Sequence, residues 1–173
     1  MRWTSSFGNS TTSSELGSVM DDEQTIEMSV PLDDDGFLRR TCPTCEREFK
    51  WFNSPEGEGE PVPVGGYFCP YCQVQAPPGS WFTNEQVELA KNRVSRDILG
   101  PEIEKMSRDL KRSSRSGLTG IEMDYEAPPE LDPLVEPNDM RRVDFACHPK
   151  EPVKVLDDWT RPVHCLICSQ QAA

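Results

Sequence analysis

The sequence predicts a small α+β protein, stapled by metal, in which two β-hairpin modules are joined by a helical connector and preceded by a disordered tail. Three observations lead to this fold class. Only 35% of the 173 residues are hydrophobic and 16 are proline, so one large core is not expected. Four of the seven cysteines lie between residues 42 and 72 and three between residues 147 and 168, and small modules with thin cores need such staples. The longest stretch with helical periodicity separates these two groups.

The first element is an acidic tail that covers residues 1–34. Its segment "TSSFGNSTTSSELGS" is rich in Ser, Thr and Gly and holds few apolar residues. Residues 1–38 carry eight acidic residues against one basic residue. Because such a segment buries too little apolar surface to offset the entropy of ordering, we predict that the tail is disordered.

The second element, residues 35–80, contains two C-x2-C pairs separated by 23 residues. Its four cysteines are Cys42, Cys45, Cys69 and Cys72. This spacing is close to that of four-thiolate zinc sites. The second pair, "CPYC", also resembles the redox motif of glutaredoxins, but a redox dithiol opens a helix, and Pro77 and Pro78 would end a helix within about a turn. Zinc ligation is therefore favoured over redox chemistry and over unrelated free thiols.

These residues resemble the zinc-ribbon family, with "TCPTCEREFKWF" as the first knuckle and "YFCPYCQ" as the second. The resemblance covers about residues 37–76. It implies a bound Zn²⁺ ion and a small antiparallel β-unit, and the alternation of Phe49 and Trp51 is typical of a strand in such a unit. Zinc ribbons serve many purposes, so the resemblance does not name a function.

The third element, residues 81–116, is predicted to be a helical connector. Thr83 and Gln86 have the spacing of a capping box at its start. Gly100 and Pro101 are expected to divide it into two helices. The apolar residues at helical spacing are Val87, Ala90, Val94 and Ile98 in the first helix and Ile103, Met106 and Leu110 in the second. An acidic, proline-rich linker, residues 117–140, follows the connector.

The last element, residues 141–173, is predicted to be a second hairpin with a weaker resemblance to a zinc ribbon, at residues 141–169. Its expected metal ligands are Cys147, His148, Cys165 and Cys168. Adjacent Cys147 and His148 would point to opposite faces of a strand, so both can bind one ion only if the chain turns there, as Pro149 permits. Two alternatives stay open: His164 replaces His148, or the hairpin carries buried thiols and no metal.

The sequence contains no sign of catalytic chemistry. It has no Gly-rich phosphate loop, no nucleophile elbow and no HExxH pair, and a zinc site closed by four ligands is structural. The chain is therefore not expected to be an enzyme. It also has no apolar run of signal-peptide or transmembrane length, so we expect no membrane association and, given its paired cysteines, a reducing cytoplasmic location.

The expected function is that of a non-enzymatic zinc-binding adaptor or accessory protein, with two Zn²⁺ ions, which engages a protein partner through its ribbon modules and helical connector. The formal net charge of −12 disfavours general nucleic-acid binding. The alternative is a nucleic-acid-binding regulator that uses the ribbon rim and the basic segment 91–115. Its rim cations are Arg39, Arg40, Arg47 and Lys50, which could equally offset the charge of a thiolate site.

Overall fold

The computed structural model of the chain describes residues 2–3, 28–55, 58–114 and 126–172. The described residues divide between two compact units, one drawn from residues 30–87 and 133–172 and the other from residues 2–3, 28–29, 88–114 and 126–132. Most of the predicted disordered tail lies outside the described residues. Its end does not fit the prediction, because Val30 and Asp33 are buried within the first of these units.

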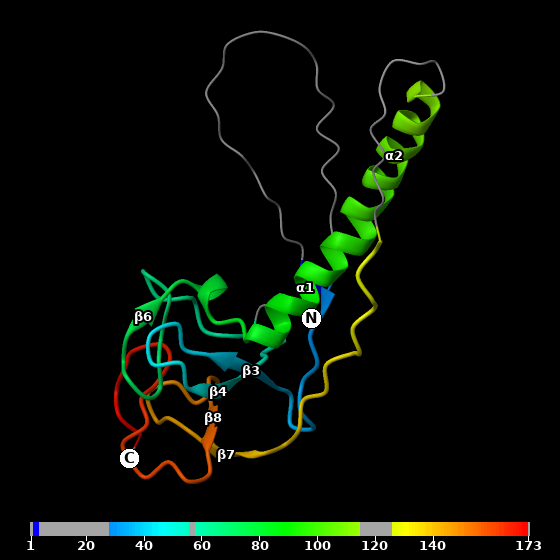
Figure 1. The fold of residues 1–173 in the computed structure, drawn as a ribbon. Helices are drawn as coiled ribbons and strands as arrows, with labels where there is room; N and C mark the ends of the chain where they lie inside the picture. Colours follow the sequence, from blue (N-terminus) through cyan, green and yellow to red (C-terminus); the bar gives the residue numbers. More distant parts are fainter. Residues whose placement is uncertain (1, 4–27, 56–57, 115–125, 173) are drawn as a thin grey trace, which may run out of the picture. The chain divides into compact units, whose positions relative to one another are not determined.

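A four-stranded antiparallel sheet organises the unit of Val30–Val87 and Pro133–Ala173 (Figure 1). Its strands are β3 (Phe37–Thr41), β4 (Glu48–Phe52), β8 (Val153–Leu156) and β7 (Met140–Val143), in that spatial order. The inner strands β4 and β8 pair with Lys50 opposite Lys154 and Trp51 opposite Val153. The two predicted hairpins therefore share one sheet.

Short elements complete the description of the chain. They are β1 (Arg2–Trp3), β2 (Met28–Ser29), β5 (Tyr67–Phe68), β6 (Gln75–Ala76) and the 3-10 turn η1 (Pro78–Ser80). Strand β1 pairs with β2, and β5 pairs with β6. The β5–β6 pair carries the second cysteine motif between its strands.

One face of the four-stranded sheet carries the hydrophobic core. Phe49 and Val153 project from the inner strands on this face and are fully buried. The Phe49 ring packs edge-on against Trp81 at 5.7 Å between centroids. Burial of each such side chain stabilises the fold by about 1.5–3 kcal/mol. The same core includes Cys69 and Cys165, so both cysteine groups contribute to it.

The opposite face of the sheet carries a row of cations. Arg39, Lys50, Lys154 and Arg142 lie directly opposite one another across the four strands. Lys50 and Lys154 are 0% and 2% exposed, and a carboxylate oxygen of Asp33 lies 3.2 Å from Lys50 Nζ and 2.9 Å from Lys154 Nζ. Buried ammonium groups are tolerated only when they are paired in this way.

Further acids cover the same row of cations. Glu136 Oε1 lies 2.8 Å from Lys50 Nζ and 2.9 Å from Arg39 Nε, and Asp139 also pairs with both cations. These acids belong to the predicted linker. Its residues 133–139 are therefore bound to the sheet, while residues 117–125 lie outside the described part of the chain.

The helical connector runs as α1 (Asn84–Val94), a π-helical turn, η2 (Ser95–Leu99), and α2 (Gly100–Ser114). The predicted capping box is confirmed, since Gln86 N donates to Thr83 Oγ1 and Thr83 N donates to Gln86 Oε1, both at 3.2 Å. The connector is divided into two α-helices and the second begins at Gly100, as predicted, but the chain does not leave the helix there, since Gly100 keeps helical dihedrals, with φ −55° and ψ −57°. Proline lacks an N–H and crowds the preceding turn, and the wider π turn accommodates it.

Among the described residues, no helix is both long and apolar enough to cross a membrane.

Candidate metal centres

The first cysteine group converges on a single point. Cys42 and Cys45 lie between β3 and β4, and Cys69 and Cys72 lie between β5 and β6. The Sγ atoms of Cys42 and Cys72 are 3.7 Å apart and those of Cys45 and Cys69 are 3.8 Å apart, with all four sulfurs within 4.8 Å of one another. Sulfurs placed tetrahedrally at about 2.3 Å from one ion would be about 3.8 Å apart. The group therefore has the dimensions of a four-thiolate metal site.

The backbone of the first knuckle explains how two of these sulfurs are positioned. Cys42 N donates to Arg47 O at 3.0 Å, and Glu46 N donates to Cys42 O at 2.9 Å. Glu46 takes a left-handed conformation, with φ 57°, which turns the chain back on itself. The amides of Thr44 and Cys45 point at Cys42 Sγ, each at 3.4 Å. These N–H groups stabilise a thiolate at that position.

The same turn occurs at Cys69 and again at Cys165. Gln73 N donates to Cys69 O at 3.0 Å and Ser169 N donates to Cys165 O at 2.9 Å, and both donors have left-handed backbones, with φ 61° and 58°. Tyr71 N and Ile167 N point at the sulfurs of Cys69 and Cys165, each at 3.4 Å. Every C-x2-C motif of the chain thus forms one kind of knuckle.

The second group combines the third knuckle, at Cys165–Cys168, with a different backbone feature. This feature is the turn at Cys147 and His148, called here the Cys-His corner. The Sγ atoms of Cys147 and Cys168 are 3.4 Å apart, and His148 Nδ1 lies 3.4 Å from Cys165 Sγ. All four ligand atoms lie within 4.8 Å of one another. The chain turns after His148, where Glu151 N donates to His148 O at 3.1 Å, so adjacent residues reach the same point.

His164 lies outside this group of ligand atoms. Its ring Nδ1 is 3.3 Å from Pro70 O, and its backbone N–H donates to the same oxygen at 3.0 Å. The structure thus brings together His148, rather than His164, with the three cysteines. Only one of those cysteines, Cys165, is buried, so the alternative of a hairpin with buried thiols does not describe Cys147 or Cys168.

The second and third knuckles face each other with reciprocal hydrogen bonds. Phe68 N donates to Leu166 O at 2.9 Å, and His164 N donates to Pro70 O at 3.0 Å. Each donor precedes the first cysteine of its own knuckle, and each acceptor follows the first cysteine of the other. Together with the pairing of β4 and β8, these bonds join the half that holds β3 and β4 to the half that holds β7 and β8.

Tyr71, inside the "CPYC" motif, is a core residue that sequence reasoning missed. Its hydroxyl donates to Glu48 O at 2.8 Å and accepts from Leu156 N at 3.1 Å, and its ring packs against Trp159 at 4.6 Å. Burial raises the pKa of Tyr71 to about 12. After Cys72 the chain continues into strand β6 and a 3-10 turn, so the helix that a glutaredoxin-like dithiol requires does not follow the motif.

Burial also controls the thiols at the sites. It raises the pKa of Cys42 and of Cys69, and it raises the pKa of Cys165 to about 12. In Cys45 and Cys168 burial acts in the same direction, but hydrogen bonds from backbone amides and neighbouring sulfurs outweigh it and lower the pKa. Because several of the ligands are neutral thiols without metal, binding of a metal ion releases protons.

The predicted rim cations are engaged within the fold. Arg39 pairs with Glu48, Glu136 and Asp139 and Lys50 with Asp33, Glu136 and Asp139, all on the charged face of the sheet. Arg40 is 2% exposed and lies 4.5 Å from the ring of Trp51. The guanidinium of Arg47 lies 5.2 Å from the ring of Trp159. Trp81, an aromatic residue at the start of the connector, is fully buried and therefore cannot stack on a base.

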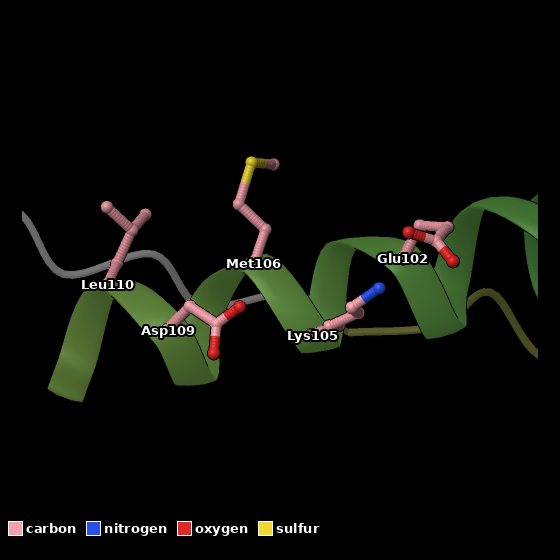
Figure 2. Close-up of a pocket in the computed structure, with 5 residues that line it drawn as sticks. All are labelled: Glu102, Lys105, Met106, Asp109 and Leu110. Carbon is pink, nitrogen blue, oxygen red and sulfur yellow. The ribbon is translucent and has the colours of Figure 1, made fainter. Parts of the chain in front are cut away.

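Apart from the metal centres, the surface of α2 has a shallow depression (Figure 2). It is lined by Glu102, Lys105, Met106, Asp109 and Leu110, which lie along one side of the same helix. Met106 is 51% exposed. The lining mixes acidic, basic and apolar groups from one element and holds no set of converging ligands or catalytic groups.

No protein-family model, curated protein or solved structure matches this chain. The geometry of the two cysteine groups supports directly that each can hold a metal ion.

Proposed function

We propose that the chain binds two structural Zn²⁺ ions and acts as a non-enzymatic adaptor that engages a protein partner. The observation that carries the metal part is the convergence of four ligand atoms at each site, within 4.8 Å of one another. The donor sets are four thiolates at one site and three thiolates with one imidazole at the other. Both sets are typical of tetrahedral zinc, whereas Mg²⁺ and Ca²⁺ take oxygen ligands.

The closed sites support a structural role for the metal. Four protein ligands leave no coordination position for a water or a substrate, which catalytic zinc requires. Cys42, Cys69 and Cys165 also belong to the hydrophobic core, so each site would fix the packing of the sheet as well as hold an ion. A reducing compartment such as the cytoplasm would keep these thiols available for metal.

The charge distribution favours a protein partner over nucleic acid. Of the rim cations that a nucleic-acid binder would present, Arg40 and Lys50 are buried and Arg39 pairs with acids, while Arg47 is exposed. The exposed apolar side chains are better suited to a protein surface. Among them are Val62, Val64 and Val74, which flank the second knuckle in the sequence, and Met106 on α2.

Elemental analysis of the full chain, purified without a metal-affinity tag, tests the metal part and should find two zinc ions per chain. Affinity purification of the native protein tests the adaptor part. We expect the partner to be lost with Met106→Asp or with Val64→Asp, and retained with the matched surface change Lys105→Asp. Protein without zinc would contradict the first part. Salt-sensitive binding to DNA or RNA, abolished by reversal of the basic residues Arg108, Lys111 and Arg112, would replace the second part.

A further inference from the structure

The two metal centres differ in how far their sulfurs are exposed. Of the seven cysteines, Cys147 alone is exposed, and Cys168 is half-exposed. At the first site no cysteine is exposed: Cys42 and Cys69 are buried, and Cys45 and Cys72 are half-exposed, with sulfurs within 4.8 Å of each other. Of the two sites, only the second therefore offers an oxidant in solution an exposed cysteine, which lies next to a half-exposed one.

The exposed pair is also the closer one. The Sγ atoms of Cys147 and Cys168 are 3.4 Å apart, against 3.7 and 3.8 Å for the two pairs of the first site. Cys147 lies on the Cys-His corner, where Ala146, Pro149 and Lys150 are exposed as well. Cys42, Cys69 and Cys165, in contrast, lie within knuckles whose amides point at their sulfurs.

We propose that Cys147 is an oxidation site for peroxides and that Cys168 is its resolving partner. The inference rests on the proposed binding of zinc. The Cys147 thiolate attacks one oxygen of a hydroperoxide, the O–O bond breaks, and a sulfenic acid and an alkoxide or hydroxide form. The Cys168 thiolate then attacks the Cys147 sulfur, an S–S bond forms, and the sulfenic oxygen leaves as hydroxide. The two sulfurs lose two electrons, the peroxide gains them, and two protons from solvent neutralise the leaving anions.

Oxidation would open the second metal centre while leaving the first intact. A disulfide between Cys147 and Cys168 removes two of the four ligands and leaves only His148 and Cys165. Two ligands do not hold structural zinc, so the ion is released. The first site keeps its ion because Cys42 and Cys69 are fully buried. The chain would thus convert exposure to peroxide into the loss of one metal ion.

The test uses the full zinc-loaded chain and hydrogen peroxide. We expect released zinc, followed with a chromogenic chelator, to level off at half of the total. Peptide mapping after alkylation of free thiols should identify a Cys147–Cys168 disulfide as the first to form. Loss of both ions together, earlier loss from the first site, or a first disulfide between other cysteines would overturn the proposal.

Two matched variants sharpen this test. Cys147→His keeps four nitrogen and sulfur ligands at the second site but removes the oxidisable sulfur, so peroxide should release no zinc at the dose that half-empties the wild type. Cys45→His makes the same change at the first site and should still release one ion. If Cys147→His fails to hold the second ion, the wild-type peptide map decides alone. A zinc content below two before peroxide is added would instead contradict the proposed function, which separates the two failures.

Discussion

The two candidate metal centres are built on one sheet from different backbone parts. The first combines two equivalent knuckles, at Cys42–Cys45 and Cys69–Cys72, whereas the second combines one such knuckle, at Cys165–Cys168, with the corner at Cys147–His148. The halves are otherwise related by reciprocal hydrogen bonds between knuckles and by the central pairing of β4 and β8. Equal ligand number therefore does not imply equal protection, since the corner carries an exposed cysteine whereas the knuckles carry only buried and half-exposed ones.

The largest difference between the sites should appear on loss of a ligand. Cys69→Ser removes a fully buried ligand from the core, and we expect loss of one ion together with loss of cooperative unfolding of the shared sheet. Structural zinc contributes about 10–16 kcal/mol in small zinc modules, which matches or exceeds the stability of a typical domain. The measurements are zinc content and thermal unfolding followed by circular dichroism.

Cys147→Ser is the matched change at the second site. It should also cost one ion, but with a smaller loss of melting temperature, because this sulfur is exposed and lies at a corner. Equal destabilisation by the two variants would show that exposure does not distinguish the sites.

The charged face of the sheet provides a test at the place where β4 pairs with β8. Asp33→Asn removes the carboxylate shared by Lys50 and Lys154 and leaves two buried ammonium groups with fewer counter-charges. We expect a loss of about 3–5 kcal/mol, as for other broken buried ion pairs. Asp34→Asn, at an exposed neighbouring position, should leave the unfolding midpoint in urea unchanged. An equal effect of both substitutions would mean that net charge, rather than this contact, matters.

A smaller effect is expected at the contact between the second knuckle and β8. Tyr71→Phe keeps the ring against Trp159 but removes the hydroxyl that accepts from Leu156 N and donates to Glu48 O. A buried amide left without a partner costs about 1–3 kcal/mol. Tyr67→Phe serves as the control. Unfolding in urea should show a smaller loss of unfolding free energy for it than for Tyr71→Phe. An unchanged unfolding free energy in Tyr71→Phe would show that the hydroxyl does not help to join the two halves.

The pH dependence of the Asp33 contact should be the smallest effect. Burial would raise the pKa of Asp33, but hydrogen bonds from Lys154, from the Phe37 amide and from Lys50 outweigh it and hold the pKa below its usual value. The folded chain therefore binds this proton more weakly than the unfolded chain. The resulting stability is present above the unfolded pKa of about 4 and is lost as pH falls through the lower folded value. The difference in melting temperature between wild type and Asp33→Asn should narrow below about pH 4, and a constant difference would contradict this sign.

Local features of the fold could be predicted from the sequence, whereas long-range ones could not. The capping box of Thr83 and Gln86 depends on residues three apart. The convergence of the Cys147 and His148 side chains on one metal site depends on a turn that Pro149 signals. The pairing of β4 with β8 joins strands about a hundred residues apart, and nothing in their alternation specifies the partner. Asp33 lies in an acidic run that reads as solvated until the lysines facing it are known. The π turn before Pro101 was likewise unpredictable, because a proline can either end or deform a helix.

The central claim, that one shared sheet holds two four-coordinate metal centres, is tested most directly by titration of the metal-free full chain with Co²⁺. We predict that the intense visible bands of tetrahedral cobalt and its thiolate charge-transfer band grow until two equivalents are bound, and that Zn²⁺ then displaces both. Saturation at one equivalent, or weak bands typical of octahedral cobalt, would contradict the account.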